Sequence, residues 1–234
     1  MLAINYVIVN NKDMEANGTT ETNEPVSPIN LDALIDLGRL SLQFSRVERV
    51  TTHEDGERKE TDSDHTVMLA VLSCSIAPQI RPDLDLGLIA QYAIHHDLVE
   101  VYAGDTVTIG VAAVDQKEKQ RAEAEALLRI TDEFSDYFPN LPEIIRRYEK
   151  LDTTEARFVK GIDKLMPIIA HFLNDGKMFK ENGTTDIGLF RIYERQTKDM
   201  EQYLFDLPEV LALRVELVRK IMRKIYPDSQ LLFE

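Results

Sequence analysis

Apolar residues recur every three or four positions along most of the chain, which is the period of a helix with one buried face. Asn30 can cap the first such helix, whose apolar face comprises Leu31, Leu34, Ile35 and Leu42. No convincing series of central strands interrupts this pattern, so the sequence predicts an all-α fold. The predicted helices cover residues 31–44, 65–77, about 83–104, 115–134, a segment opened by Pro142, 153–175, 187–205 and 207–226.

The pattern divides the chain into three parts. Residues 1–30 are mostly polar and lack a helical pattern, which predicts a flexible or arm-like segment whose opening LAINYVIV is a short strand or an arm on a partner. Residues 31–226 form the predicted helical core, and 227–234 form a tail. The charged stretch 52–64 reads as an exposed loop or hairpin, and 174–186 as a loop.

Charge and composition narrow the class of protein. The formal net charge of −14 disfavours binding to nucleic acid, which depends on clustered Lys and Arg. No apolar run approaches the ~20 residues that span a bilayer, and the N-terminus lacks the basic start of a signal peptide. Cys74 is the single cysteine, which excludes an internal disulfide. We therefore expect a cytoplasmic protein that has no membrane or nucleic-acid partner.

The segment Tyr92–Glu100, YAIHHDLVE, places two histidines and two carboxylates in apolar surroundings. His96 and Asp97 offer a neutral nitrogen and an anionic oxygen at adjacent positions, which suits a divalent cation. Glu100 follows His96 by one helical turn and shares its face. His95 points away from His96 by about 100° on a helix and is interpreted as a packed or hydrogen-bonded side chain.

Two further residues have the chemistry to complete a ligand set. His65 opens a predicted helix, and Asp163 interrupts an otherwise apolar helix face, where a carboxylate needs a strong partner. Asp163 could instead pair with Lys164 or Lys160. Spacing alone does not show that the helices carrying these residues converge. His53 is expected to be exposed, and His171 is expected to border its helix.

The ordered motifs resemble those of the HD-domain metal-dependent phosphohydrolases, most closely the YfbR-like 5'-deoxynucleotidase branch. The matching elements are ETDSDH (60–65), HDLVE (96–100), GD (104–105) and YE…TTEARFVK…D, which ends at Asp163. The resemblance covers about residues 40–175. It implies an HD-domain helical bundle with a metal site at the centre of the helices.

By resemblance, one divalent metal ion (Mn, Co, Fe, Ni, Mg or Zn) is held by four residues, His65, His96, Asp97 and Asp163. Glu100 and Asp105 then flank the metal, one acting on the attacking water and the other protonating the leaving oxygen; either could also be structural. Arg49 corresponds to an arginine near the substrate phosphate, although it could pair with Glu48 or Asp55 instead. The family usually has Arg-Trp there, whereas this chain has Arg49-Val50 and no tryptophan.

The activity implied is hydrolysis of the 5'-phosphate of (deoxy)nucleoside monophosphates, with a nucleotide as the small-molecule partner and a homodimer as the assembly. The same metal centre could support a triphosphohydrolase that releases tripolyphosphate from a deoxynucleoside triphosphate. A non-catalytic, nucleotide-sensing HD protein is the third alternative.

Overall fold

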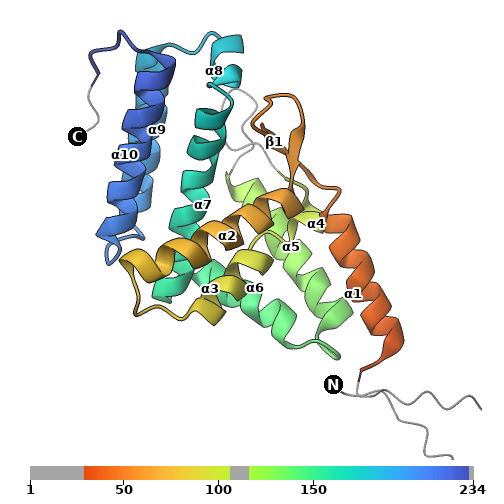
Figure 1. Ribbon diagram of the computed structural model, residues 1–234. Coiled ribbons are helices and arrows are strands. Elements are labelled where there is room, and N and C mark those ends of the chain that lie inside the picture. Colours follow the sequence, from red (N-terminus) through yellow and green to blue (C-terminus); the bar gives the residue numbers. More distant parts are fainter. Residues whose placement is uncertain (1–28, 106–115, 232–234) are drawn as a thin grey trace, which may run out of the picture.

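The structure is a computed structural model that describes residues 29–105 and 116–231. Helices dominate it, and one two-stranded hairpin is the only sheet among the described residues, which confirms the all-α prediction (Figure 1). The predicted N-terminal segment and the last residues of the tail lie outside the described part of the chain. None of the described helices combines the length and apolar character needed to cross a membrane.

The first helix, α1 (Leu31–Phe44), has the predicted bounds and cap, since the Asn30 side chain accepts a hydrogen bond from the Ala33 amide at 3.0 Å. The prediction that its apolar face packs in the core is wrong. Ala33, Leu40 and Phe44 are buried instead, because helix α1 packs on the bundle through its opposite side. The four residues assigned to the apolar face are exposed: Leu31, Leu34, Ile35 and Leu42.

The charged stretch after α1 forms an antiparallel hairpin of β1 (Glu48–Thr52) and β2 (Lys59–Thr61). Glu48 lies opposite Thr61 and Thr52 lies opposite Lys59. Gly56 in the connecting loop has a φ of 68°, a conformation that glycine adopts without strain. The hairpin carries Arg49 toward the helices.

Helix α2 (Asp62–Ile80) begins three residues before the predicted start and continues through Pro78. The early start follows from a capping box: Thr61 Oγ1 accepts a hydrogen bond from the Asp64 amide, and Asp64 accepts one from the Thr61 amide. Proline removes one backbone hydrogen bond near the end of the helix. Burial of Leu69 and Ala77 on the same helix offsets that loss.

The predicted helix of residues 83–104 is two helices. Asp85, not Asp83, caps α3 (Leu86–His95), and a turn over 96–99 separates it from α4 (Glu100–Ala103). Within the turn the Glu100 amide donates to the Asp97 carbonyl at 2.8 Å, a three-residue spacing that breaks the α-helical register. On a continuous helix, His96 and Asp97 would point ~100° apart.

The remaining helices complete the bundle. The predicted 174–186 loop contains the short α8, and α7 continues through Pro167. The bounds are α5 (Gln116–Phe134), α6 (Asn140–Lys150), α7 (Thr154–Leu173), α8 (Lys177–Glu181), α9 (Asp186–Glu201) and α10 (Pro208–Ile225).

Helix α7 belongs to both hydrophobic clusters of the described chain. Its first half, with Phe158 and Ile162, packs in the main core with α2, α3 and α6. Its second half contributes Ile168 to a separate cluster with α8, α9 and α10. Figure 1 shows α9 and α10 side by side along one flank of the molecule. Asp163 lies on the part of α7 that packs in the main core, since Ile162 and Leu165 on either side of it belong to that cluster.

Candidate metal centre

The structure brings together the four residues proposed as metal ligands. His65 comes from the first turns of α2, His96 and Asp97 from the turn after α3, and Asp163 from α7. His65 Nε2 lies 3.0 Å from Asp163 Oδ1 and 4.0 Å from Asp97 Oδ2. His96 Nε2 lies 2.9 Å from the same Asp97 oxygen. Asp97 Oδ2 therefore lies between the two imidazoles.

Neighbouring acceptors fix the orientation of both histidines. His96 Nδ1 lies 3.1 Å from the Ala93 carbonyl oxygen, which can only accept, so Nδ1 carries the proton and Nε2 is left with a lone pair in the neutral ring. His65 Nδ1 faces Glu60 Oε1 at 3.7 Å, and Thr51 donates a hydrogen bond to the other oxygen of Glu60. In metal sites such carboxylates and carbonyls orient the ligating imidazole.

A divalent cation fits this group. With its proton on Nδ1, His96 turns the Nε2 lone pair toward Asp97 Oδ2 at 2.9 Å, so two buried acceptors face each other, which is costly unless a cation binds both. One donor atom each from His65, His96 and Asp163 lies within 4.8 Å of the others. A mixed nitrogen and oxygen set suits Mn, Fe, Co, Ni, Zn or Mg, so these donors could hold such an ion.

Several buried carboxylates crowd around the cluster and shift one another's pKa values. Burial and the nearby Asp97 carboxylate raise the pKa of Glu100 to about 9, and burial raises that of Asp62 to about 6. In contrast, although burial opposes it, His96 and Arg49 hold the pKa of Asp97 well below its ordinary value. Lys164 does the same for Asp163 against its burial. The carboxylates thus compete for the same cations, and a bound divalent cation would relieve this competition.

Arg49 is the centre of an ion-pair network that faces the cluster. Its Nη1 lies 2.9 Å from Asp62 Oδ1, 2.9 Å from Asp97 Oδ2 and 3.6 Å from Glu100 Oε2. Glu48 instead pairs with Lys59, and Asp55 accepts from the amides of its own turn, so neither alternative partner holds Arg49. The Arg49 side chain keeps 17% of its area exposed.

Glu100 is buried and reaches a second cation. Its Oε1 lies 3.4 Å from Lys119 Nζ, and Lys119 also contacts Glu123 one turn later on α5. Asp105 is half-buried and adds to the negative charge around Arg49, whose pKa is raised against its burial chiefly by Asp97 and Glu100. The exposed edge of the site is formed by Arg49, Asp97 and Lys119, which are 17–24% exposed.

Sequence reasoning missed Asp62, Lys119 and the part that Glu60 plays. Asp62 is fully buried on the first turn of α2, yet charge alone made it resemble the exposed stretch around it. Lys119 lies in a charge-alternating helix where one lysine is indistinguishable from its neighbours. Glu60 carried a signal, because it belongs to the ETDSDH motif that resembles the family pattern.

The other histidines lie apart from the ligand group. His95 Nδ1 lies 2.8 Å from the Gln91 carbonyl, as expected for a hydrogen-bonded residue. His53, predicted to be exposed, is half-buried on the hairpin, 3.3 Å from Asp64. His171 is buried against Phe179, with ring centroids 4.5 Å apart. Lys164, not Lys160, contacts Asp163, at 2.8 Å.

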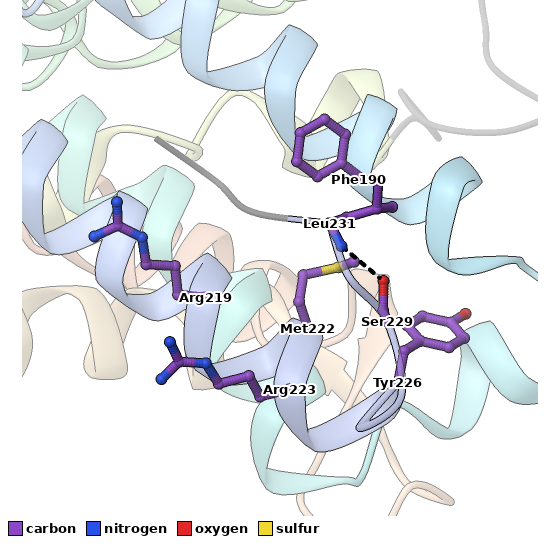
Figure 2. A pocket seen from close by; sticks show the side chains of 7 residues that line it. All are labelled: Phe190, Arg219, Met222, Arg223, Tyr226, Ser229 and Leu231. Carbon is purple, nitrogen blue, oxygen red and sulfur yellow. Dashed lines mark hydrogen bonds between the residues drawn. The ribbon is translucent and has the colours of Figure 1, made fainter.

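The described part of the protein has one hollow beside the candidate metal centre and another away from it. One of about 660 Å³, between the hairpin, α2 and α7, touches the cluster only through Glu60. The other, of about 50 Å³, is shown in Figure 2 between Met222, Tyr226 and Phe190 on α9 and α10. The second hollow is far smaller than the several hundred cubic ångströms of a typical ligand pocket. Neither hollow contains a candidate ligand histidine.

Comparison with known families identifies the family of this chain. A family model described as an HD domain matches residues 43–205, which include all four candidate ligands. The chain belongs to the HD-domain family. The match includes the hairpin and α2 to α9, whereas α1 lies almost entirely before it and α10 after it.

Two relatives of this HD domain carry the same name. The 5'-deoxynucleotidase hdd1 of Schizosaccharomyces pombe is 30% identical over 141 residues, and human 5'-deoxynucleotidase HDDC2 is 31% identical over 140. The alignments cover 57% and 58% of this chain, respectively. They span 66% of each relative, just under two thirds of its length.

Solved structures share the fold of this HD domain. A protein from Magnetospirillum magnetotacticum, described as a predicted metal-dependent phosphohydrolase, superposes with a TM-score of 0.65 at 23% identity. The superposition covers 96% of that protein and 83% of this chain. A conserved hypothetical protein from Pyrococcus furiosus gives a TM-score of 0.54 at 23% identity. That superposition covers 99% of the Pyrococcus protein and 81% of this chain.

Proposed function

We propose that this HD domain is a metal-dependent phosphohydrolase that removes the 5'-phosphate of (deoxy)nucleoside monophosphates. The convergence of the nitrogen and oxygen donors of His65, His96, Asp97 and Asp163 on one buried position carries this proposal. Two relatives named 5'-deoxynucleotidases support the substrate class.

His65, His96, Asp97 and Asp163 would hold one divalent cation. When bound, the cation supplies positive charge for the phosphoryl oxygens and acidifies a water molecule. Glu60 and the Ala93 carbonyl keep the two imidazoles turned toward this position.

The phosphate approaches from the exposed edge. Arg49 and Lys119 are the cations there, and a guanidinium can donate two parallel hydrogen bonds to a phosphate. To accept the phosphate, Arg49 exchanges part of its pairing with the carboxylates for the substrate oxygens. The two cations also balance the substrate charge against the acidic residues around them.

Glu100 and Asp105 are proposed as the proton-transfer pair. One accepts a proton from the water that attacks phosphorus, and the other gives a proton to the nucleoside 5'-oxygen as the phosphorus–oxygen bond breaks. Lys119 holds the Glu100 carboxylate in place at 3.4 Å. The products are nucleoside and orthophosphate.

The proposal includes a nucleotide as partner, a cytoplasmic location and a homodimer. A net charge of −14 repels nucleic acid from most of the surface, whereas a single phosphate needs only the local cations of the site.

Metal analysis combined with a product screen tests the proposal. The protein, its Asp97→Asn variant and the control His95→Ala are supplied with divalent metals and a panel of nucleoside mono- and triphosphates. We expect orthophosphate from monophosphates, loss of metal and activity in Asp97→Asn, and retention of both in His95→Ala.

The product separates the alternatives. Tripolyphosphate released from a triphosphate would identify a triphosphohydrolase. Full activity in Asp97→Asn would overturn the ligand assignment. Failure to hydrolyse any nucleotide, with nucleotide binding retained, would identify a sensing protein.

A further inference from the structure

Helix α1 presents a continuous apolar stripe to solvent. Leu31, Leu34, Ile35 and Leu42 are 61%, 46%, 59% and 64% exposed and lie on one side of the helix at successive turns. The opposite side buries Ala33, Leu40 and Phe44 in the bundle. An amphipathic helix normally buries one apolar face, whereas α1 has two. Figure 1 shows α1 at the edge of the molecule, where the outer face can meet another surface.

Gly38 lies within this stripe and leaves it open. A Cβ atom added at Gly38 would meet no atom within 4 Å. Glycine at the middle of a helix costs about 1 kcal/mol relative to alanine, so its presence here weakens α1 without serving its packing on the bundle. It does permit the backbone of a second helix to approach closely, as small residues do at helix–helix contacts.

The charges beside the stripe change sign along the helix. Asp32 and Asp36 lie in its first half, whereas Arg39 in the second half and Arg46 just beyond its end carry positive charge. At ~100° per residue, Asp32, Asp36 and Arg39 project from the same flank of the apolar stripe, and Arg39 contacts Asp36 within the protomer. In an antiparallel pair of identical helices, each flank meets the same flank of its partner with the order reversed. The acidic half of one copy then faces the basic half of the other.

We propose that α1 is a self-association surface, on which the α1 helix of a second copy of this chain packs antiparallel with Gly38 near the two-fold axis. Leu34 of one protomer then lies near Leu42 of the other, and Asp36 lies near Arg39 of the other. Such a contact is isologous, because the same patch serves both copies and closes the assembly at two.

Charge reversal in the full-length chain tests the pairing and its direction. In Asp36→Arg alone or Arg39→Asp alone, each contact between Asp36 and Arg39 of opposite protomers becomes repulsive. We expect each variant to dimerise at least about tenfold more weakly than the unmodified chain in sedimentation equilibrium. In a mixture of the two variants every such contact is attractive again, so heterodimers should form with an affinity close to that of the unmodified chain.

A matched control uses the outer face of α9. Glu194 and Lys198 form an exposed pair one turn apart, and their Nζ–Oε1 distance is 3.0 Å. Glu194→Lys, Lys198→Glu and their mixture should all dimerise as the unmodified chain does. Circular dichroism of every variant confirms that helix content is retained, and Leu34→Ser with Leu42→Ser provides a second disruption that changes no charge.

Three outcomes overturn the proposal. The full-length chain could be a monomer at high micromolar concentration, which would leave the stripe to another part of the chain or to a different partner. The dimer could persist in Leu34→Ser/Leu42→Ser, which would place the interface elsewhere. The mixed charge variants could fail to associate although each folds, which would exclude the antiparallel arrangement.

Discussion

The guanidinium Nη1 of Arg49 lies 2.9 Å from Asp97 Oδ2, an oxygen that also lies between the two candidate ligand histidines. This contact joins the hairpin directly to the turn after α3. The arginine that the family resemblance assigns to the substrate phosphate therefore also neutralises a candidate metal ligand. A single side chain links the charge of the ligand group to the exposed edge.

We expect Arg49→Gln to lower the free energy of unfolding by roughly 3 kcal/mol in metal-free protein, because it leaves Asp62 and Asp97 without their shared counter-charge. Urea unfolding measures this change. Asp62→Asn is the matched variant, since it keeps Arg49 paired with Asp97. The double variant should lose less than the sum of the two single losses, and strict additivity would contradict the coupling.

Glu60→Gln should weaken metal binding by about 10- to 100-fold, because the carboxylate that faces His65 Nδ1 is replaced by a neutral amide. Titration with metal in competition with a chelator measures the affinity. Glu54→Gln, on the exposed loop of the same hairpin, serves as the control and should bind as the unmodified chain does. Equal affinities for the two variants would exclude an orienting role for Glu60.

Metal binding should strengthen as the pH rises. Although burial opposes it, hydrogen bonds to Asp163 and Glu60 raise the pKa of His65 to about 9 in the metal-free protein. A histidine must be neutral to bind a metal, so below that pKa the metal competes with a proton, and the apparent affinity falls by up to about tenfold per pH unit. Calorimetry in two buffers of different ionisation enthalpy measures the proton released. Affinity that is equal at pH 7 and pH 8 would contradict this prediction.

His171 should make the folded state sensitive to acid. Burial lowers its pKa from 6.5 to about 4 in the folded protein, so between these values the unfolded chain binds a proton that the folded chain does not. Stability conferred by the neutral ring is complete above pH 6.5 and is lost as the pH falls toward 4. The free energy of unfolding should therefore decrease by about 2 kcal/mol from pH 7 to pH 5 on account of this residue.

The difference between the chain and His171→Leu isolates that contribution. Unfolding at both pH values should show a smaller decrease for the variant, whereas His53→Asn on the hairpin should retain the full decrease. If the variant and the unmodified chain lose the same stability between pH 7 and pH 5, protonation of His171 is not the cause.

Helical periodicity predicted most of the fold because it is a local property of the sequence. The bounds of α1 were predicted correctly, but periodicity could not tell which of its two apolar faces meets the core. The break between α3 and α4 was missed for a related reason, since the residues after His95 continue the apolar pattern and the turn is stabilised by backbone contacts.

The residues proposed as ligands were predicted from the ordered motifs that resemble the HD-domain family, and only His96–Asp97 and Asp163 also stand out in apolar surroundings. Their partners were not. Asp62 and Lys119 are ordinary charged residues in charged stretches, and the resemblance that gave Arg49 a substrate role did not give its pairing with Asp97. Only the meeting of the hairpin, α2, α4 and α5 brings these three residues to Asp97 and Glu100.

The division of α7 between two hydrophobic clusters has a consequence for how the molecule opens. The cluster formed by the second half of α7 with α8, α9 and α10 includes none of the candidate ligands, so local unfolding there can leave the ligand group intact. Amide hydrogens in the first half of α9 and the second half of α10, which contribute to that cluster, should then exchange at rates that metal does not change. Amide hydrogens of α2, α3 and the first half of α7 should exchange more slowly once metal is bound. Metal binding would therefore divide one domain into two parts that open at different rates.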